Sequence, residues 1–113
     1  MEFTHSFHNQ TITYHLKGRL IGEYDGTAIT EAVANNIANG DTHFVLNLKE
    51  LEHVNSIGLG VMVTLLTKAR KAGGELALAS PSTIINSMLM ITKLNTIFKV
   101  FSSVEDAENF HAD

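Results

Sequence analysis

A chain of 113 residues, 44% hydrophobic and 18% charged, is long enough to bury one continuous core, and we expect a single domain over residues 1–113. The absence of cysteine excludes disulfide scaffolds, thiol catalysis and cysteine-ligated zinc. Twelve acidic against eight basic residues give a net charge of −4, which argues against a nucleic-acid partner, since such binding depends on clustered Lys and Arg.

The N-terminal segment predicts a β-hairpin. Phe3 and Phe7 indicate a short strand, and His8-Asn9-Gln10 supplies a turn. In residues 11–21, apolar and polar side chains then alternate, with Ile12, Tyr14 and Leu16 on one face and Thr11, Thr13, His15 and Lys17 on the other. A period of two is typical of a half-buried strand.

A helix and a buried strand are expected next. Asp25-Gly26-Thr27 offers N-cap chemistry, and apolar residues recur at helical spacing up to Ile37. Asn39-Gly40 closes this helix, because both residues tolerate the left-handed conformation. Residues 43–48 form a short apolar run between two helical patterns, which predicts a central parallel strand buried on both faces.

The second half of the chain repeats this alternation. A loop through Glu50, Glu52 and His53 leads to a long apolar helix from Asn55-Ser56 to about Lys71, ended by Gly73-Gly74. A strand over Glu75 to Ala79 follows, and Pro81 starts another helix whose apolar stripe is Ile84, Ile85, Met88, Leu89 and Ile91. A last strand covers Ile97 to Phe101, and Ser102 to Asp106 caps a terminal helix. The order β-β-α-β-α-β-α-β-α predicts an α/β sheet with right-handed crossovers.

Residues of catalytic or metal-binding type do not form a recognisable site. The six histidines are scattered, and no His-Glu-x-x-His pattern occurs, so we expect no metal. Ser56 lacks the Gly-x-Ser-x-Gly elbow, and His53, the only base near it in sequence, is expected to be an interfacial loop residue. Gly58 and Gly60 lack the remaining residues of a phosphate-binding loop. We therefore expect a non-enzymatic protein without a cofactor.

The segment Val54 to Val61 is the most informative part of the sequence. A Ser at the head of a long helix places its hydroxyl where free backbone N–H groups and the helix dipole can receive an anion. Gly58 and Gly60 would let another surface approach the backbone closely. A purely structural interpretation is also open, because Ser is a favoured N-cap residue.

Asn55-Ser56-Ile57-Gly58-Leu59-Gly60 resembles the Asp-Ser-Ser/Thr-Gly-Leu/Ile-Gly signature of the STAS domain of anti-sigma factor antagonists. The resemblance covers essentially the whole chain, through Leu16 to Leu20 with Asp25, Phe44 to Leu48, Lys71 to Leu78, and Leu94 to Phe101. It implies the STAS fold, a small mixed β-sheet with helices packed mainly on one side.

The resemblance also implies a partner-switching function. The unphosphorylated protein would bind an anti-sigma factor, which is a serine-protein kinase related to histidine-kinase ATPases, and would thereby release a sigma factor. That kinase would phosphorylate Ser56, and a metal-dependent phosphatase of the PP2C type would reverse the reaction. ATP and magnesium would belong to the kinase. The residues implied at the partner contact are Asp25, Asn55, Ser56, Ile57, Gly58 and Leu59.

Two residues depart from the family signature. Asn55 replaces the usual Asp, and Ile57 replaces the second Ser/Thr. Ile57 would extend a docking surface if exposed and would be part of the core if buried. Two other functions remain open: an unphosphorylated STAS adaptor in a transporter or stress-signalling complex, and a small ligand- or nucleotide-binding domain.

No signal peptide is visible at the N-terminus, because no basic segment is followed by an apolar run. The longest apolar stretch, around Ile57 to Leu66, is interrupted by Gly58, Gly60 and Thr64 and falls short of a membrane span. We therefore expect a cytoplasmic protein.

Overall fold

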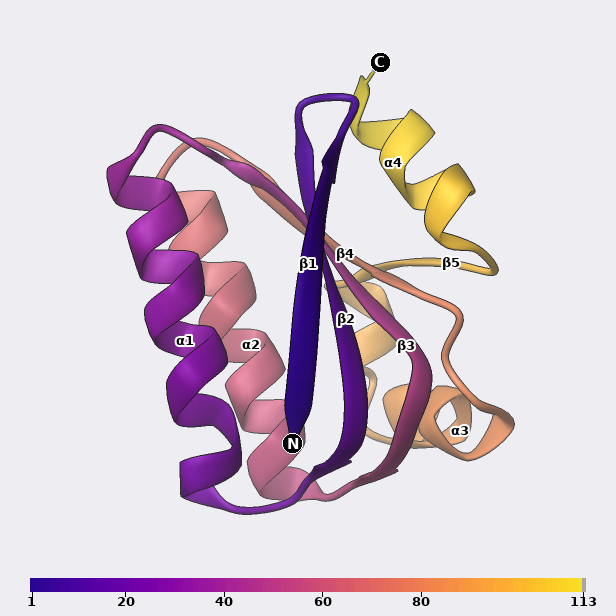
Figure 1. Ribbon diagram of the computed structural model, residues 1–113. Coiled ribbons are helices and arrows are strands. Elements are labelled where there is room, and N and C mark those ends of the chain that lie inside the picture. The colour runs from indigo at the N-terminus through magenta and orange to yellow at the C-terminus, as the bar shows by residue number, and fades with distance from the viewer. Residues whose placement is uncertain (113) are drawn as a thin grey trace.

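The computed structural model describes residues 1–112, in which strands and helices alternate in the predicted order (Figure 1). The strands are β1 (Glu2–His8), β2 (Thr11–Leu20), β3 (His43–Val54), β4 (Glu75–Ala79) and β5 (Lys99–Phe101). The helices are α1 (Glu23–Ala38), α2 (Ser56–Lys71), α3 (Thr83–Ile91) and α4 (Val104–Ala112), with a 3₁₀ turn, η1, at Leu94–Thr96. None of the helices in the described residues is long and apolar enough to cross a bilayer.

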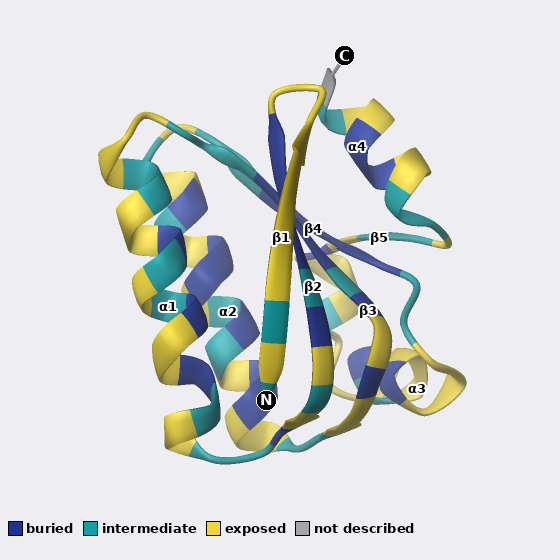
Figure 2. Ribbon diagram, in the orientation of Figure 1, coloured by how far each residue is buried: buried dark blue, intermediate teal, exposed yellow. Residues whose placement is uncertain are grey.

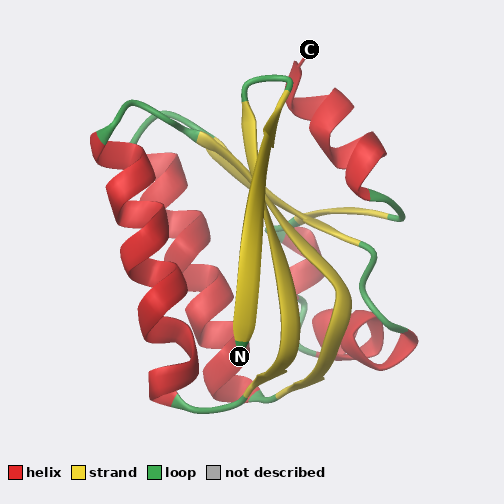
Figure 3. Cartoon of the chain, in the orientation of Figure 1, coloured by secondary structure: helices red, strands yellow, loops and turns green. Residues whose placement is uncertain are grey.

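The sheet has the order β1-β2-β3-β4-β5, with β1 antiparallel to β2 and the other neighbours parallel. Because successive parallel strands are added in one direction, right-handed crossovers place their connecting helices on one face. Residues of α1, α2 and α3 accordingly share one core cluster with that face. The fourth helix, α4, follows the last strand and covers part of the opposite face (Figure 3). The expected architecture, a small mixed β-sheet with helices packed mainly on one side, is confirmed.

The N-terminal hairpin is confirmed, and the backbone angles of its turn explain how the two strands pair. Asn9 and Gln10 have φ values of +54° and +59°, and the strands pair in register from His8 opposite Thr11 to Glu2 opposite Lys17. Positive φ at both central residues is the requirement of the type I′ turn, whose twist matches that of the flanking strands.

The prediction that β2 is half buried is wrong at its beginning. Thr11 and Thr13, expected on a polar solvent face, are fully buried because α4 covers them. The Thr13 hydroxyl donates a hydrogen bond to the buried carboxylate of Glu108, with an oxygen–oxygen distance of 2.6 Å. The other oxygen of this carboxylate lies 3.3 Å from Nδ1 of His8, so Glu108 joins α4 to both strands of the hairpin.

Three other boundaries differ from the expected ones. Helix α1 begins at Glu23, before Asp25-Gly26-Thr27, because Gly22 is the N-cap. The expected loop through residues 50–53 is the second half of β3, where these residues pair with β2. The last strand begins at Lys99 and not at Ile97, because the backbone N–H groups of Ile97 and Phe98 both donate hydrogen bonds to the Leu94 carbonyl oxygen and so continue the turn of η1.

The apolar stripe of α3 is only partly buried. Ile85 and Leu89 face the core, whereas the side chains of Ile84 and Ile91 are 73% and 82% exposed. Helix α3 spans only nine residues and lies at the margin of the helical layer, so one narrow face is enough to pack it.

Candidate functional site

The residue that caps α2 is Asn55, and Ser56 is the first residue of the helix. The Asn55 side-chain oxygen accepts a hydrogen bond from the backbone N–H of Gly58 at 3.1 Å, which is the N-cap interaction. The interpretation of Ser56 as the cap is therefore wrong. Ser56 is exposed at the helix N-terminus, and the cap does not require its hydroxyl.

Asn55 also links the N-terminus of α2 to the loop between β2 and α1 by a hydrogen bond. Its side-chain N–H donates a hydrogen bond to the carbonyl oxygen of Ile21 at 2.8 Å. The amide thus uses its acceptor on α2 and its donor on the neighbouring loop. A carboxylate, the usual group of the family signature, could supply only the first of these bonds.

Replacing Asn55 is expected to separate these two contributions. Asn55→Ala loses both bonds and should lower the free energy of unfolding by about 2 kcal/mol. Asn55→Asp keeps the cap and loses only the donor to Ile21, so its stability should lie between wild type and Ala, about 1 kcal/mol below wild type. Urea denaturation at neutral pH measures both differences. An Asp variant as stable as wild type would show that the Ile21 bond contributes nothing.

Gly58 lies beneath the site because α2 approaches the end of β2 very closely. A Cβ atom on Gly58 would lie 2.0 Å from the carbonyl oxygen of Leu20. Gly58 is buried, and the Leu59 side chain is only 4% exposed. These two buried residues pack the N-terminus of α2 against the rest of the domain. The close approach that Gly58 permits is between α2 and β2 of the same chain, and not between this chain and a partner. Gly60, by contrast, is exposed, and a Cβ added to it would have open space around it.

The first turns of α1 and α2 lie side by side and carry the exposed apolar groups of the site (Figure 1). The helices touch where Gly26 meets Val61, whose nearest methyl carbon would lie 2.6 Å from a Cβ on Gly26. Ile57 is 46% exposed, so the alternative that it is part of the core is wrong. Tyr24, in the first turn of α1, is 93% exposed and was not predicted as a site residue. Its position outside the apolar stripe of α1 was the only sequence signal.

The Asp25 side chain binds the backbone of the loop that precedes α1. One carboxylate oxygen accepts hydrogen bonds from the backbone N–H groups of Ile21, at 3.1 Å, and Gly22, at 2.9 Å. These bonds lower the pKa of Asp25 below its usual value. Asp25 and Asn55 therefore bind successive parts of the β2–α1 loop, and together they fix it beside Ser56.

The lowered pKa of Asp25 has a consequence in acid. A depressed folded-state pKa adds stability above the ordinary carboxyl pKa of about 4, and this stability is lost as the pH falls through the folded-state value. Asp25→Asn should therefore show a shallower loss of stability below about pH 4 than wild type. Urea midpoints of both proteins measured between neutral pH and pH 3 would test this. An equal loss of stability in wild type and Asp25→Asn below about pH 4 would contradict it.

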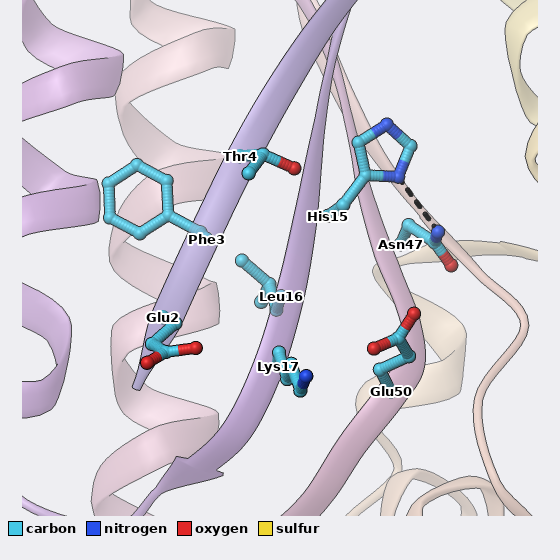
Figure 4. A pocket seen from close by; sticks show the side chains of 8 residues that line it. All are labelled: Glu2, Phe3, Thr4, His15, Leu16, Lys17, Asn47 and Glu50. Carbon is cyan, nitrogen blue, oxygen red and sulfur yellow. Dashed lines mark hydrogen bonds between the residues drawn. The ribbon is translucent and has the colours of Figure 1, made fainter.

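A separate polar hollow lies on the sheet between β1, β2 and β3 (Figure 4). Its volume is about 350 Å³, and no residue of the β3–α2 junction contributes to its lining. His15 there has one ring nitrogen 2.9 Å from the Asn47 amide nitrogen and the other 3.0 Å from the Ser6 hydroxyl. Both nitrogens are thus engaged in structural contacts. His53, expected in an interfacial loop, is an exposed residue of β3.

Comparison with known proteins gives a consistent result. A sequence model of the STAS domain matches residues 4–107. A proposed anti-sigma factor antagonist from Thermotoga neapolitana is 34% identical over 68 residues, and this match covers 60% of this chain and 60% of the relative. The chain therefore matches less than two thirds of that relative's length.

Two solved structures share the fold. The crystal structure of a proposed anti-sigma factor antagonist from Thermotoga maritima gives a TM-score of 0.89 at 22% identity, covering 98% of this chain and 95% of that one. The phosphorylated form of SpoIIAA, a cell fate determinant of Bacillus, gives a TM-score of 0.75 at 19% identity, covering 96% and 97%. At these identities the likeness concerns the fold.

Proposed function

This chain belongs to the STAS domain family, and on that basis we propose that it is an anti-sigma factor antagonist controlled by phosphorylation of Ser56. In this proposal the unphosphorylated chain binds an anti-sigma factor with serine-kinase activity and releases a sigma factor. The chain acts as a regulatory binding protein, and the kinase supplies ATP and magnesium. A metal-dependent phosphatase restores the binding form.

The observation that carries the proposal is the exposed Ser56 at a helix N-terminus whose cap is already supplied by Asn55. Modification of Ser56 breaks no capping bond, so the hydroxyl is available to a kinase. A phosphate adds about −1.5 to −2 charge and three acceptor oxygens. The N-terminal end of α2 tolerates this charge because of its free N–H groups and its dipole. The fold should therefore survive modification.

The same modification would weaken a partner contact. The exposed Tyr24 and Ile57 offer apolar area on the first turns of α1 and α2, and Ile57 directly follows Ser56 in the chain. A partner that covers these side chains would have to desolvate a phosphate dianion beside them, which is costly without a compensating charge. Asp25, Asn55, Gly58 and Leu59 contribute by holding the loop and helix in place. Phosphorylation would thus act on the interface and leave the domain folded.

The test uses the anti-sigma kinase encoded in the same genome. We expect the unmodified chain to bind it and to displace its sigma factor, and we expect ATP to cause transfer of one phosphate, located at Ser56 by mass spectrometry. Ser56→Ala should still displace the sigma factor but should not be switched by ATP. A chain that binds no such kinase, and that instead recovers transporter subunits or titrates a nucleotide or phospholipid, would contradict the proposal and support one of the other two functions.

A further inference from the structure

The outer edge of β1 lacks the usual protection against pairing with another strand. β1 is the first strand of the sheet and pairs only with β2, over seven residue pairs without a bulge. Its sequence, Glu-Phe-Thr-His-Ser-Phe-His, contains no Pro, Gly, Lys or Arg. The opposite edge strand, β5, spans three residues and carries the exposed Lys99. Short edges and edge lysines prevent strand addition, whereas long regular edges permit it.

The hairpin turn determines which backbone groups of β1 face outward. His8 and Thr11 flank the two-residue turn, so they form a hydrogen-bonded pair, and hydrogen-bonded pairs then alternate along the ladder. Glu2, Thr4, Ser6 and His8 consequently direct their N–H and C=O groups toward β2. Phe3, His5 and Phe7 direct theirs away from it. β1 is drawn as exposed along most of its length (Figure 2).

We propose that β1 pairs in antiparallel register with β1 of a second copy of this chain, about a two-fold axis at His5. The outward-facing residues Phe3, His5 and Phe7 are symmetric about that axis. His5 then lies opposite the partner's His5, and Phe3 lies opposite the partner's Phe7. Each facing pair can exchange two backbone hydrogen bonds. The two sheets become one continuous sheet.

The side chains of β1 are complementary to themselves in this register. Phe3 and Phe7 lie on the helical face, opposite the buried Leu16 and Ile12 of β2, and the dimer adds an aromatic pair on each side of the axis. Figure 4 shows Phe3 and Thr4 projecting from opposite sides of β1. On the Thr4 side, Thr4 would lie opposite the partner's Ser6.

The facing side chains and the exposed surface of β1 favour the same occupant. In this register no like charges face each other, since Glu2, the acidic residue of the strand, lies opposite the partner's His8, whose Nδ1 is 3.3 Å from Glu108 of its own chain. The Phe7 side chain is 63% exposed in the single chain, and pairing with the partner's Phe3 would cover it. A second copy thus meets both faces of β1 with matched side chains. The proposal does not depend on the proposed function, because no residue of α2 belongs to this edge.

A single introduced cysteine can test the register, because the chain has none of its own. Residues in a hydrogen-bonded pair are about 5.5 Å apart between Cα atoms, which lies within the range of a disulfide. We expect His5→Cys to form a covalent dimer under mild oxidation of the untagged full chain. Phe7→Cys is the matched control, because the two Phe7 positions are offset by four residues, about 13 Å. Cross-linking of His5→Cys that is no faster than that of Phe7→Cys overturns the proposal.

Sedimentation velocity tests the edge itself. His5→Pro removes an outward N–H without removing a bond to β2, and Phe7→Lys places a charge on the edge. Each should raise the dimer dissociation constant about tenfold or more, while circular dichroism shows an unchanged fold. Ser87→Lys adds the same charge on α3 between the exposed Ile84 and Ile91 and should leave the dimer intact. A chain that is monomeric at its highest soluble concentration, or a dimer disrupted only by Ser87→Lys, overturns the proposal.

Discussion

Gly58→Ala is expected to lower the free energy of unfolding by about 3 kcal/mol or more. The added Cβ would lie 2.0 Å from the carbonyl oxygen of Leu20, which is a backbone atom and cannot move aside by a rotamer change. Relief requires a displacement of α2 away from the end of β2. That displacement would also strain the hydrogen bond from the Asn55 amide to the carbonyl oxygen of Ile21, which links the N-terminus of α2 to the residue after β2. The loss should therefore appear in stability and in partner affinity together.

Gly60→Ala is the matched control, two residues further along the same helix. No atom lies within 4 Å of its Cβ position, and alanine is a better helix former than glycine, so stability should rise by about 0.5–1 kcal/mol. Urea denaturation of both variants gives the comparison. Equal stabilities would mean that α2 can move from β2 at little cost, and the close contact would then have no energetic importance.

Much of the fold could be predicted because local chemistry and global arrangement agree. Gly40 after α1 and Gly73 after α2 have positive φ, as the preference of glycine indicated, whereas Asn39 caps α1 at a negative φ. The period of two in β2 and the turn at Asn9-Gln10 gave the hairpin. Each of these features depends on residues that are close together in the chain, so the local sequence is enough to predict it.

The errors arose where a distant element determines the environment. Thr11 and Thr13 are buried by α4, which is almost a hundred residues away in sequence; Thr13 and Glu108 are separated by 95 positions. Glu50 and Glu52 are polar enough to suggest a loop, yet β2 extends far enough to pair with this segment. Contacts of this kind follow from tertiary packing, which overrides the local pattern.

The candidate site also has some features that the local sequence predicts and others that depend on tertiary packing. The position of Ser56 at a helix N-terminus followed from the sequence, but the identity of the cap did not, because Asn and Ser are both good N-cap residues. The exposure of Ile57 could not be decided from its neighbours. Tyr24 was missed because its position depends on how the first turn of α1 packs beside α2. The sequence therefore predicted the helix N-terminus at which Ser56 lies, and the structure was needed to define the surface around it.

Ser56→Glu is expected to weaken binding to the proposed anti-sigma factor partner about 100-fold, which corresponds to about 2.7 kcal/mol. The negative charge would have to be desolvated beside the apolar surface of Tyr24 and Ile57 when the partner docks. In the free protein the same charge lies at the positive end of the α2 dipole. The free energy of unfolding should therefore stay constant or rise by about 0.3–1 kcal/mol.

Ser56→Gln separates charge from size, because it has nearly the shape of Glu without the charge. We expect its affinity, measured by isothermal titration calorimetry, to lie much nearer to wild type than that of Ser56→Glu. Equal losses for the two variants would show that bulk at Ser56 blocks the partner, and phosphorylation would then act by steric exclusion. A loss in Ser56→Glu with Ser56→Gln near wild type would identify the charge as the cause. If that loss changes little with salt concentration, the cause is desolvation of the charge, because ions screen interactions between charges and do not remove the cost of burying one. The stability of α2 and the affinity of the partner would then change independently, as a switch at a helix N-terminus requires.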